Sequence, residues 1–84
     1  MNRQDLMNTF MKARGSGAEY IFVAVKLPDL EIPEMIVNRK ENFDSKERYY
    51  LMAYDENLVH YHNKEISIVG LSYGDLDEIK NIYQ

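Results

Sequence analysis

The stretch Tyr20-Ile21-Phe22-Val23-Ala24-Val25-Lys26-Leu27 decides the fold, because seven of its eight residues are apolar and Pro28 ends it. A run of this length, rich in β-branched and aromatic residues, indicates a strand and not a helix. Both sets of alternating side chains are apolar, so both faces of the strand should be covered by protein. We therefore expect residues 20–27 to form the central strand of a sheet.

The composition of the chain excludes several classes of protein. Its 84 residues suit a single domain, residues 1–84, and the absence of cysteine excludes disulfides and cysteine chemistry. Fourteen acidic and ten basic side chains give a net charge of −4, which argues against direct binding to nucleic acid. The N-terminal segment is polar, and no apolar run approaches the roughly 20 residues of a membrane span. We expect a soluble, cytoplasmic protein that holds no cofactor.

The residues before the central strand predict a helix. Asn2 is a suitable cap, and Asp5 stands where a capping box needs an acid. Leu6 and Phe10 lie four apart and form part of an apolar face. Gly15-Ser16-Gly17 ends the helix. The alternative for this triplet is a phosphate-binding loop, but such loops follow a strand and precede a helix, so we favour a plain connector.

The residues after the central strand predict two further strands and two further helices. We expect a loop over 28–33, a strand over 34–38, a helix capped by Asn42, a strand over 65–71 that Tyr73-Gly74 breaks, and a last helix from Asp75 to about Tyr83. Asn57 is the residue best suited to a left-handed turn after the second helix. The expected core-facing residues of the second helix and its continuation are Phe43, Tyr50, Leu51, Tyr54 and Leu58.

These elements predict a small α/β (α+β) domain with the order α-β-β-α-β-α. The strand-helix-strand connection should be right-handed. If the most apolar strand is central, the three strands lie in the order 2-1-3, and the first strand is antiparallel to both neighbours. A sheet face that the helices leave bare would need a partner or a second copy of the chain to cover it.

The only two histidines are a candidate metal site. His60 and His62 would point to the same side of an extended segment, and Asp55 or Glu65 could supply a third ligand. The alternative is a pair of exposed histidines beside Tyr61, which we favour because no third ligand is defined. We therefore predict no metal, and keep a small histidine-dependent metal-binding domain as an alternative.

No residue pattern indicates catalysis. The serines lie in no nucleophile context. Asp75, Asp77 and Glu78 stand at the start of an expected helix, where acids complement the helix dipole. We predict no catalytic residue and a protein that is not an enzyme.

Tyrosine and methionine are the strongest functional signal, because interfaces between proteins favour both types. The expected partner-binding residues are Tyr49, Met52 and Tyr61, with the acidic Asp55 and Glu56 beside them. The alternative is that the tyrosines and methionines complete the edges of the core. The expected partner is a protein of unknown identity, and a homodimer is the second possibility.

Two segments resemble known proteins. They are residues 41–58, which include Asn42-Phe43-Asp44 and a run rich in tyrosine, and residues 66–74, which begin with a short strand of isoleucine and valine. Together they resemble small accessory proteins of phages and prophages of low-GC Gram-positive bacteria. The resemblance covers the second half of the chain. It implies a phage accessory protein in the cytoplasm of a bacterial host, where such proteins bind and inhibit host or defence proteins, as anti-CRISPR inhibitors do.

Overall fold

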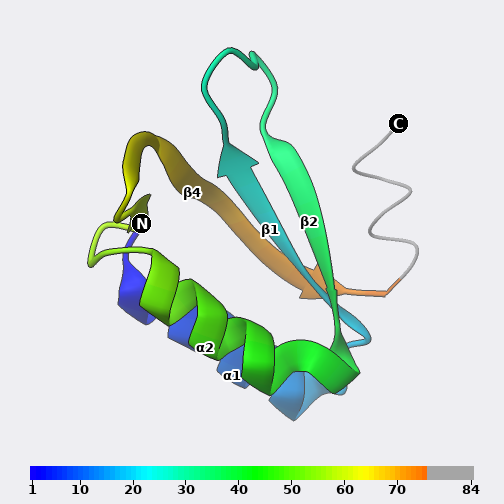
Figure 1. The fold of residues 1–84 in the computed structure, drawn as a ribbon. Coiled ribbons are helices and arrows are strands. Elements are labelled where there is room, and N and C mark those ends of the chain that lie inside the picture. Colours follow the sequence, from blue (N-terminus) through cyan, green and yellow to red (C-terminus); the bar gives the residue numbers. More distant parts are fainter. Residues whose placement is uncertain (76–84) are drawn as a thin grey trace.

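The structure is a computed structural model that describes residues 1–75. Its elements are α1 (Arg3–Ser16), β1 (Tyr20–Lys26), β2 (Glu34–Arg39), the 3₁₀ turn η1 (Lys40–Asn42), α2 (Phe43–Ala53), β3 (Val59–His60) and β4 (Asn63–Gly74) (Figure 1). The helix expected from Asp75 to Tyr83 lies outside the described residues, apart from Asp75.

The sheet has the order β2-β1-β4-β3. β1 is antiparallel to β2 and to β4, so the predicted order 2-1-3 of the three long strands and the central position of the first are confirmed. The two-residue strand β3 was not expected; it pairs antiparallel with the start of β4 and adds a fourth strand.

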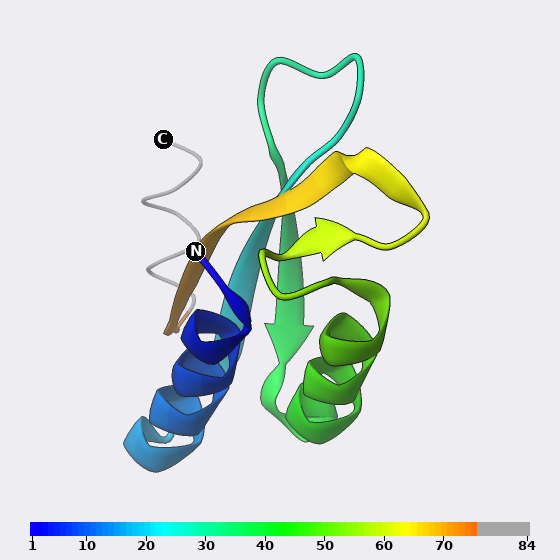
Figure 2. The ribbon, with the colours of Figure 1, turned by 90° about the vertical axis from the view of Figure 1, so that its left-hand side faces the viewer.

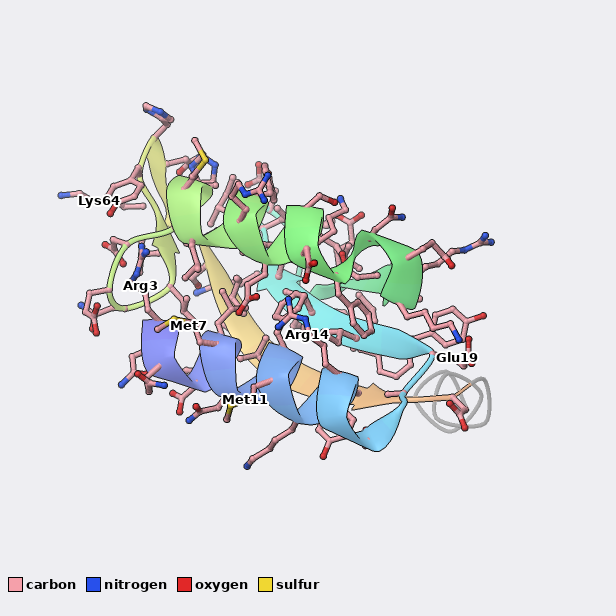
Figure 3. The ribbon with its side chains drawn as sticks, turned by 90° about the horizontal axis from the view of Figure 1, so that it is seen from below. Arg3, Met7, Met11, Arg14, Glu19 and Lys64 are labelled. Carbon is pink, nitrogen blue, oxygen red and sulfur yellow. The ribbon has the colours of Figure 1, made fainter. Side chains whose placement is uncertain are left out.

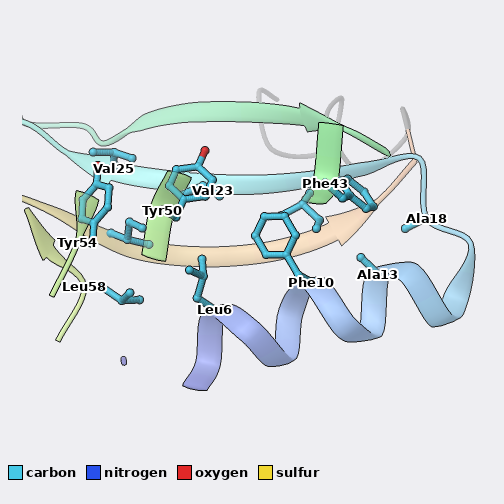
Figure 4. Packing of buried hydrophobic residues seen from close by; sticks show 12 residues of the cluster. Leu6, Phe10, Ala13, Ala18, Val23, Val25, Phe43, Tyr50, Tyr54 and Leu58 are labelled. Carbon is cyan, nitrogen blue, oxygen red and sulfur yellow. The ribbon is translucent and has the colours of Figure 1, made fainter. Parts of the chain in front are cut away.

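Both helices lie against the same face of the sheet (Figure 2). Side chains of β1 on this face, such as Val23, join residues from α1, α2 and β4 in the core (Figure 4). Phe22 lies on the opposite face and is only 1% exposed, and the ring of Tyr20 stacks beside it at 6.2 Å between centroids. On the helix face of β1, Ile21, Val23 and Val25 are buried, whereas on the opposite face Phe22 is buried and Tyr20 and Ala24 are partly exposed. The prediction that protein covers both faces of this strand is therefore confirmed for the helix face and only in part for the other.

The ends of α1 follow the predicted local chemistry. Asn2 Oδ1 accepts a hydrogen bond from the Asp5 N–H at 3.0 Å, and Asp5 Oδ2 accepts one from the Asn2 N–H at 2.7 Å. This reciprocal pair is the predicted capping box. Gly17 takes the left-handed conformation with φ of 72°, and its N–H bonds back to the last turn of the helix.

The structure corrects the predicted ends of α2. Asn42 is at the N-cap, but its side chain makes no capping bond because its backbone, with φ of −109° and ψ of 7°, is not extended. The helix ends at Ala53, and yet Tyr54 and Leu58 beyond it are buried in the core as expected. The left-handed residue in this turn is Leu58, with φ of 60°, and not Asn57.

β4 is much longer than predicted, since it runs from residue 63 to residue 74 and includes Tyr73-Gly74. Its register against β1 shifts between Ala24 and Val25, which face Gly70 and Ile68 and leave Val69 as an extra residue. Because of this bulge, Ile68 and Leu71 both pack on the core, although strict alternation would place two residues that are three positions apart on opposite faces.

Candidate protein-binding surface

Tyr49 and Met52 form the exposed side of α2. They lie three residues apart, which brings side chains to the same side of a helix. Tyr49 is 51% exposed and Met52 is 73% exposed, whereas Phe43 and Tyr50 on the inner side are buried. Two large side chains that favour interfaces are therefore presented to solvent by an element whose other side is held in the core.

Tyr61 comes from a different element and meets the same end of α2. It lies in the turn between β3 and β4, and its side chain is 58% exposed. Its backbone N–H donates a hydrogen bond of 3.0 Å to the carbonyl oxygen of Ala53, the residue after Met52. The fold thus brings the β3–β4 turn to the C-terminal end of α2. We call Tyr49, Met52 and Tyr61 the aromatic-methionine surface.

Asp55 and Glu56, predicted as the acidic part of this surface, differ in what they do. The Asp55 Oδ1 atom accepts hydrogen bonds from the N–H groups of Asn57 at 2.9 Å and Val59 at 3.0 Å. The Asp55 carboxylate therefore orders the turn after α2, and its Oδ1 atom is already occupied by these two hydrogen bonds. Glu56 is exposed, and its backbone carbonyl accepts a bond of 3.0 Å from the Arg3 N–H. Within residues 1–75, the Glu56 carboxylate forms no salt bridge, so of the two acids it is the one available to a partner.

A basic residue, Lys46, also borders the aromatic-methionine surface, and the sequence prediction did not include it. The Lys46 ammonium lies 5.6 Å from the centre of the Tyr49 ring, a cation–π distance. The Tyr49 ring also stands edge-on to Tyr50 at 5.3 Å between centroids. These contacts restrict the Tyr49 ring before any partner arrives. The i, i+3 spacing of Lys46 and Tyr49 was the signal in the sequence.

The buried tyrosines beneath this surface are structural. The Tyr50 hydroxyl donates a hydrogen bond of 3.0 Å to Asn38 Oδ1. Burial raises the pKa of Tyr50 to about 12. Burial also raises the pKa of Tyr54. Both hydroxyls therefore stay protonated at neutral pH, and neither is tuned for acid–base chemistry there.

The two histidines pack against protein groups. The ring of His60 stands edge-on to Tyr54 at 5.3 Å, and its Nδ1 atom accepts a hydrogen bond of 3.1 Å from the His62 N–H. Asp55 is one of the two residues proposed as a third metal ligand, and its carboxylate accepts hydrogen bonds from the turn after α2. Within residues 1–75, no three histidine, aspartate or glutamate side chains are grouped so as to hold a metal ion.

Exposed apolar residues also occur at a second place, the loop predicted over residues 28–33. Leu30 and Ile32 lie between β1 and β2, and Ile32 is 79% exposed. Pro28 and Pro33 bound this loop, and Asp29 within it has φ of 68°. The two prolines around apolar residues were the signal in the sequence, because proline restricts the backbone of a loop.

Comparisons with known proteins do not assign this chain to a family. No family model matches this chain, and no curated protein or solved structure matches it either. Among the described residues, no helix has the length and apolar character to cross a membrane.

Proposed function

We propose that this chain is a non-enzymatic protein-interaction module that acts by stoichiometric binding through the aromatic-methionine surface. The observation that carries the proposal is the exposure of Tyr49, Met52 and Tyr61 on adjoining elements. Tyrosine and methionine are enriched at interfaces, and a restricted aromatic ring loses little entropy on binding.

We further propose that the module is a phage-encoded accessory protein that binds and inhibits a host or defence protein in the bacterial cytoplasm. This part rests on the resemblance of residues 41–58 and 66–74 to phage and prophage accessory proteins. A net charge of −4 is compatible with a partner that carries a basic patch, such as a nucleic-acid-handling enzyme.

The test is a pull-down from a bacterial lysate with the wild-type chain and with a Tyr49→Ala, Met52→Ala double variant. Truncating two side chains at the centre of an interface weakens binding by about 2 kcal/mol or more, which is about thirtyfold in Kd. We expect the wild type to recover a protein in a fixed stoichiometry, measured by native mass spectrometry, and the double variant to lose it.

The matched control is a Leu30→Ala, Ile32→Ala double variant, which also truncates two exposed apolar side chains but on the β1–β2 loop. It should recover the partner as the wild type does. Equal recovery by the wild type and the Tyr49/Met52 variant, with circular dichroism showing both folded, would remove the proposed surface.

A further inference from the structure

Among residues 1–75, no strand covers the outer edge of the second half of β4. On the side away from β1, β3 pairs with β4 at Asn63 and Ser67, and the last bond on this side runs from the Ile68 N–H to the Leu58 carbonyl at 2.9 Å. Within residues 1–75, no strand pairs with the outer edge of residues 69–74. Alternate backbone N–H and C=O groups of this segment are therefore available to another strand.

This edge lacks most of the features by which proteins block such pairing. Residues 69–74 include no charged residue and no proline, and only the bulge at Val69 distorts them. The outer edge of β2, by contrast, begins directly after Pro33 and carries Glu34 and Arg39 at its two ends. The β4 edge is thus the less protected of the two.

A groove of about 700 Å³ lies along the same edge, between β4 and α1. Figures 2 and 3 show α1 beside the C-terminal half of β4. On the strand side the groove is lined by Leu71, Ser72 and Tyr73, and on the helix side mainly by Asp5, Asn8, Thr9 and Lys12. The residues on both sides of the groove are partly or fully exposed.

The charges on the helix side are complementary to those of a second copy. Asp5 and Lys12 are seven residues apart, about 10 Å along the axis, which is too far for an ion pair within α1. Neither residue forms a salt bridge in the part of the chain that the structure describes. In an antiparallel pair of α1 helices centred between Asn8 and Thr9, Asp5 of each copy stands opposite Lys12 of the other.

We propose that two copies of this chain associate through the β4 edge and the groove beside it. A twofold axis midway between the two Ser72 residues, perpendicular to the sheet, pairs the two β4 edges antiparallel and keeps the helices of both copies on one side. Leu71 of each copy then lies opposite Tyr73 of the other, and the two Ser72 residues face each other. The same axis makes the α1 helices antiparallel and forms two Asp5–Lys12 pairs. The dimer leaves the aromatic-methionine surface to a different partner.

Cross-linking tests the axis directly, because the chain contains no cysteine. Directly opposed residues of antiparallel strands have Cα atoms about 4.5–5.5 Å apart, within the range of a disulfide. A Ser72→Cys variant should therefore form a disulfide-linked dimer on mild oxidation. Ser45→Cys, a matched change at an exposed serine of α2, should stay monomeric on the same non-reducing gel.

Sedimentation equilibrium tests the association without a cross-link. The wild type should sediment at twice the mass of one chain at micromolar concentration. Lys12→Glu replaces each of the two Asp5–Lys12 pairs by two facing carboxylates. It should therefore raise the dissociation constant of the dimer about tenfold or more. Asp5→Lys combined with Lys12→Glu restores the opposite charges and should restore the dimer. Because Asp5→Lys also removes the capping box of α1, circular dichroism first checks that this double variant is folded. Lys64→Glu, the same charge change at the other end of β4, should leave it intact.

Several outcomes overturn the proposal. A monomeric wild type would do so, as would equal cross-linking through Ser45→Cys and Ser72→Cys, or a dimer that Lys12→Glu does not weaken. These results are independent of the pull-down, since Tyr49 and Met52 do not line the groove. Loss of the dimer therefore leaves the proposed function standing, and loss of the captured partner leaves the dimer standing.

Discussion

Asn38 is the one buried polar or charged residue among those that the structure describes, and it is hydrogen-bonded to Tyr50. Asn38 is 1% exposed; its Nδ2 atom donates to the Ile21 carbonyl at 3.1 Å, and its Oδ1 atom accepts from the Tyr50 hydroxyl at 3.0 Å. No buried side-chain nitrogen or oxygen in residues 1–75 lacks a partner. Because an unpaired buried polar group is costly, this pair specifies how α2 sits on β2 and β1.

Breaking the pair on one side should destabilise the fold. Asn38→Leu leaves the Tyr50 hydroxyl without a partner, and we expect the free energy of unfolding to fall by about 1–3 kcal/mol. Tyr50→Phe leaves Asn38 Oδ1 unpaired and should cost a similar amount. Urea denaturation of both single variants and the double variant measures the coupling. Strictly additive losses would show that the hydrogen bond contributes nothing.

The raised pKa of Tyr50 predicts a loss of stability at high pH. Below pH 10, folded and unfolded chains both hold the phenolic proton, so the stabilisation is constant. Between pH 10 and about 12 the unfolded chain ionises first, and the free energy of unfolding should fall by about 2–3 kcal/mol. Tyr50→Phe should remove most of this decline, and Tyr61→Phe, at an exposed site, should not. The measurement is urea denaturation across this pH range.

At the scale of elements, α1 shows how local chemistry sets a boundary. The helix has its apolar residues Leu6, Phe10 and Ala13 on the buried side, and it ends where Gly17 turns left-handed. Gly15, two residues earlier, is inside the helix, and a Cβ at either glycine would meet nothing within 4 Å. The two glycines therefore differ only in backbone conformation.

Alanine at these two glycines should have opposite effects. Gly15→Ala should raise the free energy of unfolding by about 0.5–1 kcal/mol, because glycine loses more entropy than alanine in a helix. Gly17→Ala should lower it by about 1 kcal/mol or more, because its φ of 72° is strained for an L side chain. Thermal unfolding of both variants checks the signs. A shift of the same sign for both would contradict this account of the helix end.

At the scale of the whole molecule, Arg14 joins the two helices. It lies between α1 and α2 (Figure 3), and its guanidinium pairs with Asp44 at 2.8 Å and with Glu47 at 2.6 Å. These residues are 30 and 33 positions away in the chain. The pairs fix the ends of two helices that share one sheet face.

Removing this link should have a small, salt-dependent effect. Asp44 is highly exposed and Arg14 is partly exposed, so Arg14→Gln should lower the free energy of unfolding by no more than about 1 kcal/mol. Raising the salt concentration should shrink the difference between the variant and the wild type, because salt screens exposed charges. Chemical denaturation at low and high salt measures it. A large loss that salt leaves unchanged would point to packing of the Arg14 stem instead.

What lies close together in the sequence was predictable from it. The capping box of α1, the stop at Gly17 and the central position of β1 follow from hydrogen bonds and apolar patterns within a few residues, and the structure confirms them. The exposed positions of Tyr49 and Met52 follow from helical spacing in the same way.

Tertiary contacts decided the rest. β4 continues through Tyr73-Gly74 because β1 pairs with it as far as Gly74, and its bulge arises from that register. Tyr54 and Leu58 stay in the core after α2 has ended, because Asp55 turns the chain and β4 lies beside it. Pairing between distant segments also places Tyr61 at the end of α2. It likewise leaves the outer edge of β4 beside α1 without a neighbouring strand among residues 1–75. Each depends on which distant segments pair, and a linear pattern of residue types does not encode that pairing locally.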